Sequence, residues 1–278
     1  MTSYYDTTVI PLVAVFKKQV RHQLRYPGEF LIVIIIPYFL TTLLFVMGSF
    51  LGTSNANANF AQRTGSTLPP FLYQIIGAGV WMVSWVIVET VGSSLRNEQI
   101  NGTLEQNFLA PINRFVLLVG TALAQVIISV ILFVSVIAVS VLALLPQDAF
   151  RLLIAFLVLL VGLIPMFGVG FVLAAFVVRF KEPYAFTQVV NLLFGVLGGT
   201  FYNIAILPQW AQIVSRTIPL THVISDTRLI LEPTQTLVAT GGSFLILLTM
   251  AFVYPILGYT LFKGYEKQAK ITGGLSKY

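Results

Sequence analysis

The chain alternates between long apolar runs and short polar stretches. The apolar runs cover residues 30–51, 71–93, 115–145, 152–178, 184–200 and 242–262. Each is near or above the ~20 residues that a helix needs to cross the hydrocarbon core of a bilayer. Because no water is present there to satisfy a free backbone, these runs should be helical. The pattern therefore predicts six transmembrane helices.

Residues 9–26 carry a different, amphipathic pattern. One helical face holds Leu12, Phe16, Val20 and Leu24, and the opposite face holds Lys17, Lys18, Arg21, His22 and Arg25. An apolar stripe opposite a basic face is typical of a helix that lies in the membrane interface. A water-facing tail with accidental periodicity is the alternative.

Residues 201–233 are irregular, with apolar pieces too short to cross a membrane. Pro208, Pro219 and Pro233 interrupt them. Short hydrophobic segments of this kind predict a re-entrant helical hairpin before the last span. We expect Arg228, inside this region, to extend to the outer membrane interface.

The composition supports an all-α integral membrane protein formed by a single domain over residues 1–278. Hydrophobic residues make up 57% of the chain, charged residues only 9%, and the mean hydropathy is +0.89. A soluble exterior requires far more charge. The net charge of +6 does not indicate nucleic-acid binding, because the basic residues flank the spans instead of forming one patch.

The sequence contains no recognisable catalytic, nucleotide-binding or metal-binding pattern. There is no cysteine, and neither His22 nor His222 lies in an HExxH motif. A GxxxxGK[ST] phosphate loop is also absent. We therefore expect no cofactor and no metal bound by this chain.

The distribution of basic residues predicts the orientation. If the N-terminus lies inside, six spans return the C-terminus inside, and twelve of the sixteen Lys and Arg residues fall on that side. Cytoplasmic segments carry such an excess. Both termini and the polar segment 96–114 are thus expected in the cytoplasm, while the segments after 51, 145 and 200 lie outside.

Segment 96–114, RNEQINGTLEQNFLAPINR, should contain a short helix. Asn101-Gly102 is a turn dipeptide, Thr103 and Gln106 form a capping box, and Pro111 stops the helix. Leu104 and Phe108 then share one face, four residues apart. Two apolar side chains on a cytoplasmic loop predict a partner protein that covers them.

Three residues of the second span are candidates for a substrate path. Glu89 is the one carboxylate placed inside a span, where a charge is costly and marks function. The alternative is that Glu89 lies near the cytoplasmic end of the span and its side chain simply reaches water. Trp81 and Trp85 lie one turn apart and could stack on a substrate, although such pairs more often face lipid or pack between helices.

In the fifth span, Gly195 and Gly199 form a GxxxG pattern that allows close helix packing.

Two separated motifs resemble the type-2 ABC exporter permeases. Glu98, Gly102-Thr103-Leu104-Glu105 and Pro111 are similar to the family's cytoplasmic-loop signature. The outer segment contains GTFY at 199–202, LPQW at 207–210, IPLT at 218–221 and DTR at 226–228, which resembles the family's region before the last span. One departure is Asn97, which stands where the family often has Arg; here Arg96 lies one residue earlier.

The resemblance covers nearly the whole chain and carries specific implications. The Thr103–Leu109 segment would be a coupling helix that docks on a separate ABC ATP-binding subunit, which holds ATP and Mg²⁺. Its contact residues would be Glu98, Gly102, Thr103, Leu104, Glu105 and Phe108. The permease would be no enzyme itself, would pair with a second permease copy, and would sit among lipids in a prokaryotic plasma membrane.

The substrate is implied only as a class. Apolar spans and short outer loops favour a hydrophobic or amphipathic molecule, drug-like or lipid-like, moved out of the cytoplasm or inner leaflet. Permeases for polysaccharides and lipid-linked glycans share the architecture and are the alternative. An ATP-independent channel or secondary carrier, with Glu89 binding an ion, and a membrane-embedded enzyme are further alternatives.

Overall fold

The chain is helical throughout the part that the structure describes. This computed structural model describes residues 8–51, 56–100, 114–144, 149–180, 183–232, 235 and 241–272, and no strand occurs among them. The α-helices are α1 (Ile10–Arg25), α2 (Pro27–Leu51), α3 (Ala56–Thr64), α4 (Pro70–Gly92), α5 (Ser94–Ile100), α7 (Arg114–Leu144), α8 (Ala149–Phe180), α9 (Pro183–Leu197), α10 (Gln209–Thr217), α11 (Pro219–Leu231) and α12 (Gly241–Thr272). The predicted all-α class is confirmed for these residues.

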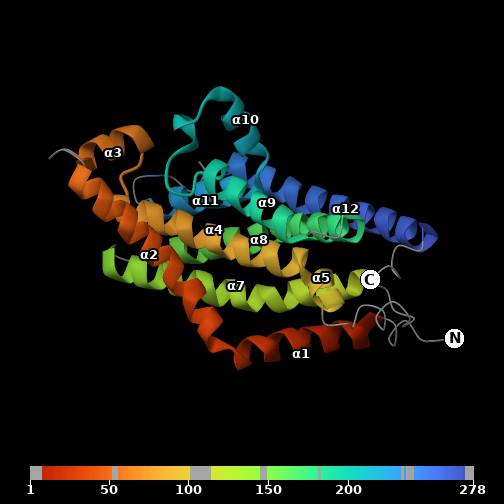
Figure 1. The fold of residues 1–278 in the computed structure, drawn as a ribbon. Helices are drawn as coiled ribbons and strands as arrows, with labels where there is room; N and C mark the ends of the chain where they lie inside the picture. Colours follow the sequence, from red (N-terminus) through yellow and green to blue (C-terminus); the bar gives the residue numbers. More distant parts are fainter. Residues whose placement is uncertain are drawn as a thin grey trace.

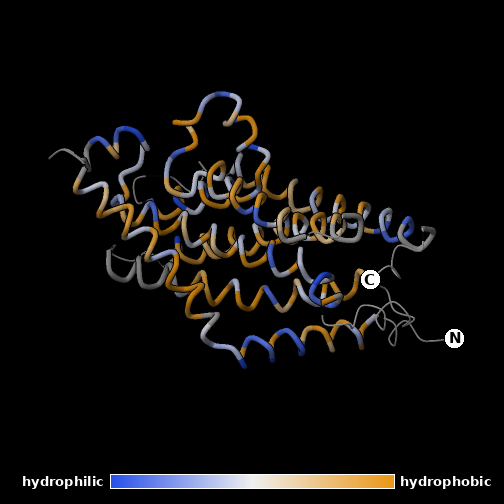
Figure 2. Tube along the Cα trace, in the orientation of Figure 1, coloured by the Kyte–Doolittle hydropathy of each residue, from blue (hydrophilic) through white to orange (hydrophobic). Residues whose placement is uncertain are grey.

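Five helices in the described residues are long and apolar enough to cross a membrane. Their apolar segments are Leu31–Phe50, Pro70–Gly92, Phe115–Ser135, Phe150–Phe176 and Gly241–Gln268, in α2, α4, α7, α8 and α12. Apolar residues dominate these helices, and polar residues gather at the end of α12 (Figure 2). Five of the six predicted spans therefore appear as single long helices.

The predicted fifth span, 184–200, is shorter than expected. Helix α9 has 15 residues, or about 22 Å at 1.5 Å per residue, against a hydrocarbon core of roughly 30 Å. It ends at Leu197 because the chain turns at Gly198 and Gly199, and Gly199 has a φ of 71°. That left-handed conformation is readily adopted by glycine and ends a helix. A sixth crossing by one helix is not seen among the residues that the structure describes.

Helix α4 is the centre of the packing. In its apolar segment 72% of residues are buried, against 11% in α2 and 17% in α12, so α2 and α12 lie at the periphery. Figure 1 shows α4 running beside α7 and α8, with which it makes its main contacts. Leu72, Ile75 and Ile87 are fully buried on it. The residues of the second predicted span thus form the core of the described fold.

Two segments are more helical than the sequence predicts. Residues 56–64, expected as part of a polar loop, form α3, and its Phe60 packs edge-on against Tyr73 with ring centroids 5.4 Å apart. Helix α12 continues to Thr272, although the last span was predicted to end at 262. Lys and Glu residues after 262 are good helix formers, so nothing stops the helix at the membrane boundary.

The region after α9 contains a 3₁₀ turn at Ile204–Ile206 and then α10 and α11. The two helices meet at Ile218, whose extended backbone (φ −84°, ψ 119°) separates them. Pro219 begins α11, where a missing N–H costs nothing. Helix α11 is almost entirely buried and packs on α8, α4 and α12. Residues 233 and 234 lie outside the described part.

Helix α1 lies within the segment 9–26 that was predicted as an amphipathic helix, and the chain breaks at Tyr26 before α2. It runs alongside the first part of α7 (Figure 1). Gly120 of α7 permits this contact, because a Cβ there would lie 3.1 Å from the Leu12 carbonyl oxygen and from Val15. The contact fixes α1 to the bundle at the end where α5 follows α4.

Candidate functional site

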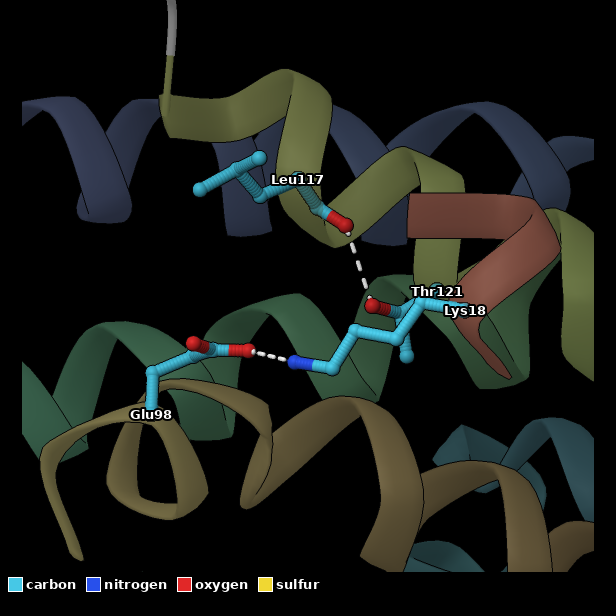
Figure 3. Close-up of polar contacts among 4 residues, drawn as sticks. All are labelled: Lys18, Glu98, Leu117 and Thr121. Atoms are coloured by element: carbon cyan, nitrogen blue, oxygen red, sulfur yellow. Dashed lines mark hydrogen bonds and ion pairs between the residues drawn. The ribbon is translucent and has the colours of Figure 1, made fainter. Parts of the chain in front are cut away.

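The segment before the predicted coupling helix is anchored to α1. Glu98 of α5 forms an ion pair with Lys18 of α1 (Figure 3). Nearby on α7, the Thr121 hydroxyl donates to the Leu117 carbonyl oxygen at 3.0 Å. Helices α1, α5 and α7 therefore meet around Glu98.

A polar cavity lies at this junction. Its volume is about 310 Å³, and it is lined by Lys18, Gln19, His22, Thr90, Ser94, Asn97, Glu98, Ile100 and Thr121. The lining carries one carboxylate beside an ammonium group and an imidazole, together with several neutral hydrogen-bonding groups. Residues 101–113, with the predicted ATPase contacts Gly102, Thr103, Leu104, Glu105 and Phe108, follow directly and lie outside the described residues.

The sequence did not identify Lys18 as the partner of Glu98. The basic face of residues 9–26 was assigned to lipid headgroups, and Glu98 was assigned to the ATPase. A basic helix and an acidic loop predicted on the same side of the membrane were a signal for this pair. Their separation of 80 residues left the contact unrecognised.

At the opposite face of α4, Trp81 contacts α9. Its indole Nε1 donates to the Asn191 carbonyl oxygen at 3.2 Å. The rings of Trp81 and Trp85 meet edge-on, with centroids 5.4 Å apart. A Cβ on Gly195 would lie 2.9 Å from the Trp81 ring, so the missing side chain makes room for the indole. Gly199 lies beyond the end of α9 and does not take part in this contact.

Glu89 faces the same helix near the end of α4. Gln188 Nε2 lies 3.5 Å from Glu89 Oε2, at the limit of a hydrogen bond. Glu89 is half-buried, and its backbone carbonyl accepts from the Ser93 hydroxyl at 2.6 Å. Glu89, Trp85 and Trp81 thus follow one another along the contact between α4 and α9.

Asn191 is a functional candidate that the sequence reading missed. Its side chain is fully buried, yet neither amide atom has a hydrogen-bond partner among the described residues. A buried amide without partners is costly and calls for an explanation. The signal was available, since Thr187 and Asn191 follow each other at four-residue spacing in an apolar run. The two side chains lie on the face of α9 that α4 covers, beside Glu89 and Trp81.

At the other end of α4, Arg228 is buried instead of extending to the interface as predicted. Its Nε donates to Tyr73 O at 3.0 Å, Nη1 to Gly199 O at 2.8 Å and Nη2 to Thr200 O at 2.6 Å. The guanidinium carbon lies 3.6 Å from the centre of the Tyr73 ring. The expectation was wrong because carbonyl groups released at the end of α9 satisfy a buried guanidinium.

Burial lowers the pKa of Arg228 to about 10, so it stays charged at neutral pH. It lines a cavity of about 190 Å³ between α11 and the segment after α9. Glu232 lines the same cavity and accepts from the Thr67 hydroxyl at 2.9 Å and from the Thr67 backbone N–H at 2.5 Å. These bonds tie the end of α11 to the start of α4.

The comparison with protein families identifies the chain. The family model described as "ABC-2 type transporter" matches residues 11–231, which is most of the 278 residues. No curated protein matches the chain. The match includes α1, the spans α2, α4, α7 and α8, and the α10–α11 pair. The chain belongs to the ABC-2 type transporter family, as a multi-pass membrane permease that works with a separate ATP-hydrolysing subunit.

Proposed function

We propose that this permease exports a hydrophobic or amphipathic molecule, drug-like or lipid-like, from the cytoplasm or the inner leaflet. The observation that carries the proposal is the contact between α4 and α9. Aromatic rings of Trp81 and Trp85 stand there beside the half-buried Glu89 and the unpartnered amide of Asn191. An apolar wall with a few polar groups suits a molecule that has both kinds of surface.

The drive would come from the ATPase subunit through segment 101–113. Its predicted helix would present Leu104 and Phe108 to that subunit, with Gly102, Thr103 and Glu105 around them. Support comes from its anchorage, because α5 leads into this segment and the Glu98–Lys18 pair connects it to α1. ATP and Mg²⁺ would bind the partner subunit, whose closure would move this segment and the helices attached to it.

We further propose six crossings with both termini in the cytoplasm. Thr187 contacts Gly92 at the end of α4, whereas the Asn203 side chain donates to the Thr64 carbonyl oxygen, ahead of the start of α4. The chain therefore travels along the length of α4 between residues 187 and 203. Helix α9 with the extended residues after it would be the fifth crossing, and α10–α11 would be the re-entrant pair on the outer side.

A second permease copy would complete the path. Helix α9 exposes Val189, Leu192 and Val196, and α2 exposes Leu31, Ile35 and Phe39. Lipid covers apolar faces in a membrane, but a path needs a second wall opposite α4 and α9. In a dimer in a prokaryotic plasma membrane, the exposed faces of α2 and α9 would lie at the centre, and the second copy would supply this second wall. Export of polysaccharide or lipid-linked glycan is the alternative for the same architecture.

The experiment is a transport assay with permease and ATPase subunit reconstituted in inside-out vesicles. A fluorescent amphipathic dye and a lipid-linked glycan are tested in parallel, with ATP and with a non-hydrolysable analogue. The proposal predicts ATP-dependent uptake of the dye, reduced by Trp81→Ala. Uptake of the glycan alone would favour the alternative. Flux through permease vesicles without the ATPase subunit would favour an ATP-independent channel or carrier.

A further inference from the structure

Asp226, on α11, is the most anomalous buried group outside the α4–α9 contact. Its side chain is fully buried, and neither carboxyl oxygen has a hydrogen-bond partner in the described part of the chain. An ionised carboxylate in such surroundings is strongly disfavoured unless a donor or a cation compensates it. Its protonation state therefore depends on which neighbouring groups can donate to it.

The neighbouring hydrogen bonds have a fixed direction. His222 lies one turn before Asp226, with its Nε2 2.9 Å from the Arg216 carbonyl oxygen and its Nδ1 3.1 Å from the Ser243 hydroxyl. A carbonyl oxygen only accepts, so Nε2 carries the hydrogen. In a neutral imidazole Nδ1 must then accept, and the Ser243 hydroxyl donates its one hydrogen to it.

This direction leaves Ser243 without a hydrogen for Asp226. Ser243 lies close enough to influence that carboxyl group, but the two do not form a hydrogen bond of normal geometry. Only lone pairs of the Ser243 oxygen are available, and those can accept from a carboxylic acid but not bind a carboxylate. An ionised Asp226 would gain a hydrogen-bond donor only if the Ser243 hydroxyl stopped donating to His222, or if His222 became protonated.

We propose that Asp226, Ser243 and His222 form a binding site for one proton, held mainly as the acid form of Asp226. With that proton the chain of hydrogen bonds runs from Asp226 through Ser243 and His222 to the Arg216 carbonyl group. If the same proton were on His222, the Asp226 carboxylate and the His222 imidazolium would both be charged and buried. Removing both charges from water would cost more free energy than keeping Asp226 and His222 neutral.

The titration of Asp226 agrees with this site. Burial raises the pKa of Asp226 from 3.8 to about 6. A hydrogen bond donated by Ser243 would oppose this shift, but the bond from Ser243 to His222 withholds that hydrogen. The site would thus change occupancy between mildly acidic and neutral conditions.

The other ionisable groups around α11 are engaged elsewhere. Arg228 bonds three carbonyl groups near α4, and Arg151 of α8 donates to the carbonyl oxygens of Ile230 and Glu232. Glu232 accepts from Thr67, and the Tyr254 hydroxyl of α12 donates to Thr217 O at 2.6 Å. Arg216 of α10 has an exposed side chain, and Tyr73 of α4 stacks on Arg228. None of these contacts supplies a charge to Asp226.

The site joins two helices and is reachable from solvent. Ser243 belongs to α12 and is partly exposed, whereas Asp226 and His222 belong to α11. A proton can therefore reach Asp226 through the Ser243 hydroxyl. Its binding strengthens the contact between α11 and α12, so acidification holds α11 more firmly in the bundle. The existence of this site does not depend on the proposed direction of transport.

Infrared difference spectroscopy of the full permease in lipid nanodiscs tests the proposal. The C=O stretch of a protonated carboxylic acid is recorded while pH is lowered from 8 to 4. We expect a band with a midpoint near 6, lost in Asp226→Asn and unchanged in the control Glu232→Gln. Absence of the band, or survival in Asp226→Asn, would overturn the proposal.

Two further variants test the direction of the hydrogen bonds without removing the carboxyl group. Ser243→Ala deletes the oxygen that accepts from the acid form of Asp226, so the midpoint should fall. His222→Phe frees the Ser243 hydrogen to donate to an ionised Asp226, so the midpoint should fall. A rise of the midpoint in either variant, or no shift in both, would contradict the proposed site.

Discussion

Lys18 and Glu98 form an ion pair that joins α1 to α5, across 80 residues of sequence. The Lys18 side chain is 60% exposed and that of Glu98 22%, so solvent screens the pair. Exposed pairs contribute about 0–1 kcal/mol to stability. The significance of this pair is therefore positional, because it holds the segment that enters the predicted coupling helix against α1.

Lys18→Ala should lower ATP-dependent transport while leaving the unfolding midpoint almost unchanged. The free-energy change should stay below about 1 kcal/mol. Transport and thermal unfolding of the reconstituted complex are the measurements. The reversed pair Lys18→Glu with Glu98→Lys should restore transport relative to either single change. A double variant no better than the single ones would show that the pair plays no part in coupling.

Gly77→Ala should strongly destabilise the permease. A Cβ there would lie 1.9 Å from the Thr200 carbonyl oxygen and 2.3 Å from Arg228 Nη2, which cannot both move without losing their bond. Gly48→Ala in α2 is the matched control, since nothing lies within 4 Å of its Cβ. The control should be neutral or stabilised by up to ~1 kcal/mol through helix propensity. Equal unfolding midpoints for the two variants would refute this packing.

Asn191→Leu should raise stability and lower transport. Replacing a buried amide that lacks partners by an apolar group of similar size removes a desolvation cost of about 1–3 kcal/mol. If the amide serves the substrate, the same change removes a polar contact from the path. Thermal unfolding and dye uptake are measured on the same preparation. A variant that is more stable and transports normally would assign Asn191 no role in transport.

The unfolding free energy should fall as pH rises from about 4 to above 6. Because the folded state raises the pKa of Asp226 from 3.8 to about 6, it binds the proton more tightly than the unfolded chain. Stability is highest below 3.8 and declines until the folded group is ionised, by about 3 kcal/mol in total. Asp226→Asn should flatten this dependence between pH 4 and pH 7 in a denaturation series. If the unfolding free energy of Asp226→Asn still fell with pH to the same extent, Asp226 would not be the cause of the pH dependence.

The spans were predictable because their signal is local. Hydropathy alone placed 71–93 and 115–145 within one residue of α4 and α7. The end of α9 at Leu197 was not predicted, because the fifth apolar run continues to residue 200. Glycines are common in spanning helices, so Gly198 and Gly199 did not by themselves indicate a turn. In the structure Gly199 has a positive φ, and its carbonyl group accepts from Arg228.

The polar contacts could not be predicted because they depend on distant residues. Arg228 finds its partners on Tyr73, Gly199 and Thr200, and only the folded chain brings these carbonyl groups together. The same holds for Lys18 with Glu98. Residue type showed that such groups need partners, whereas helix packing determined which ones they have. The predicted ATPase contacts in 101–113 stay predictions of the sequence.

Co-purification of the permease with its ATPase subunit tests the central claim most directly. Leu104→Asp with Phe108→Asp should abolish it, because both charges would fall on the face that the ATPase subunit covers. Gln106→Glu, on the opposite face of the predicted helix, is the control: it adds a charge, keeps the capping box with Thr103, and should co-purify normally. Retention of the ATPase subunit by the Leu104→Asp, Phe108→Asp double variant would contradict the account.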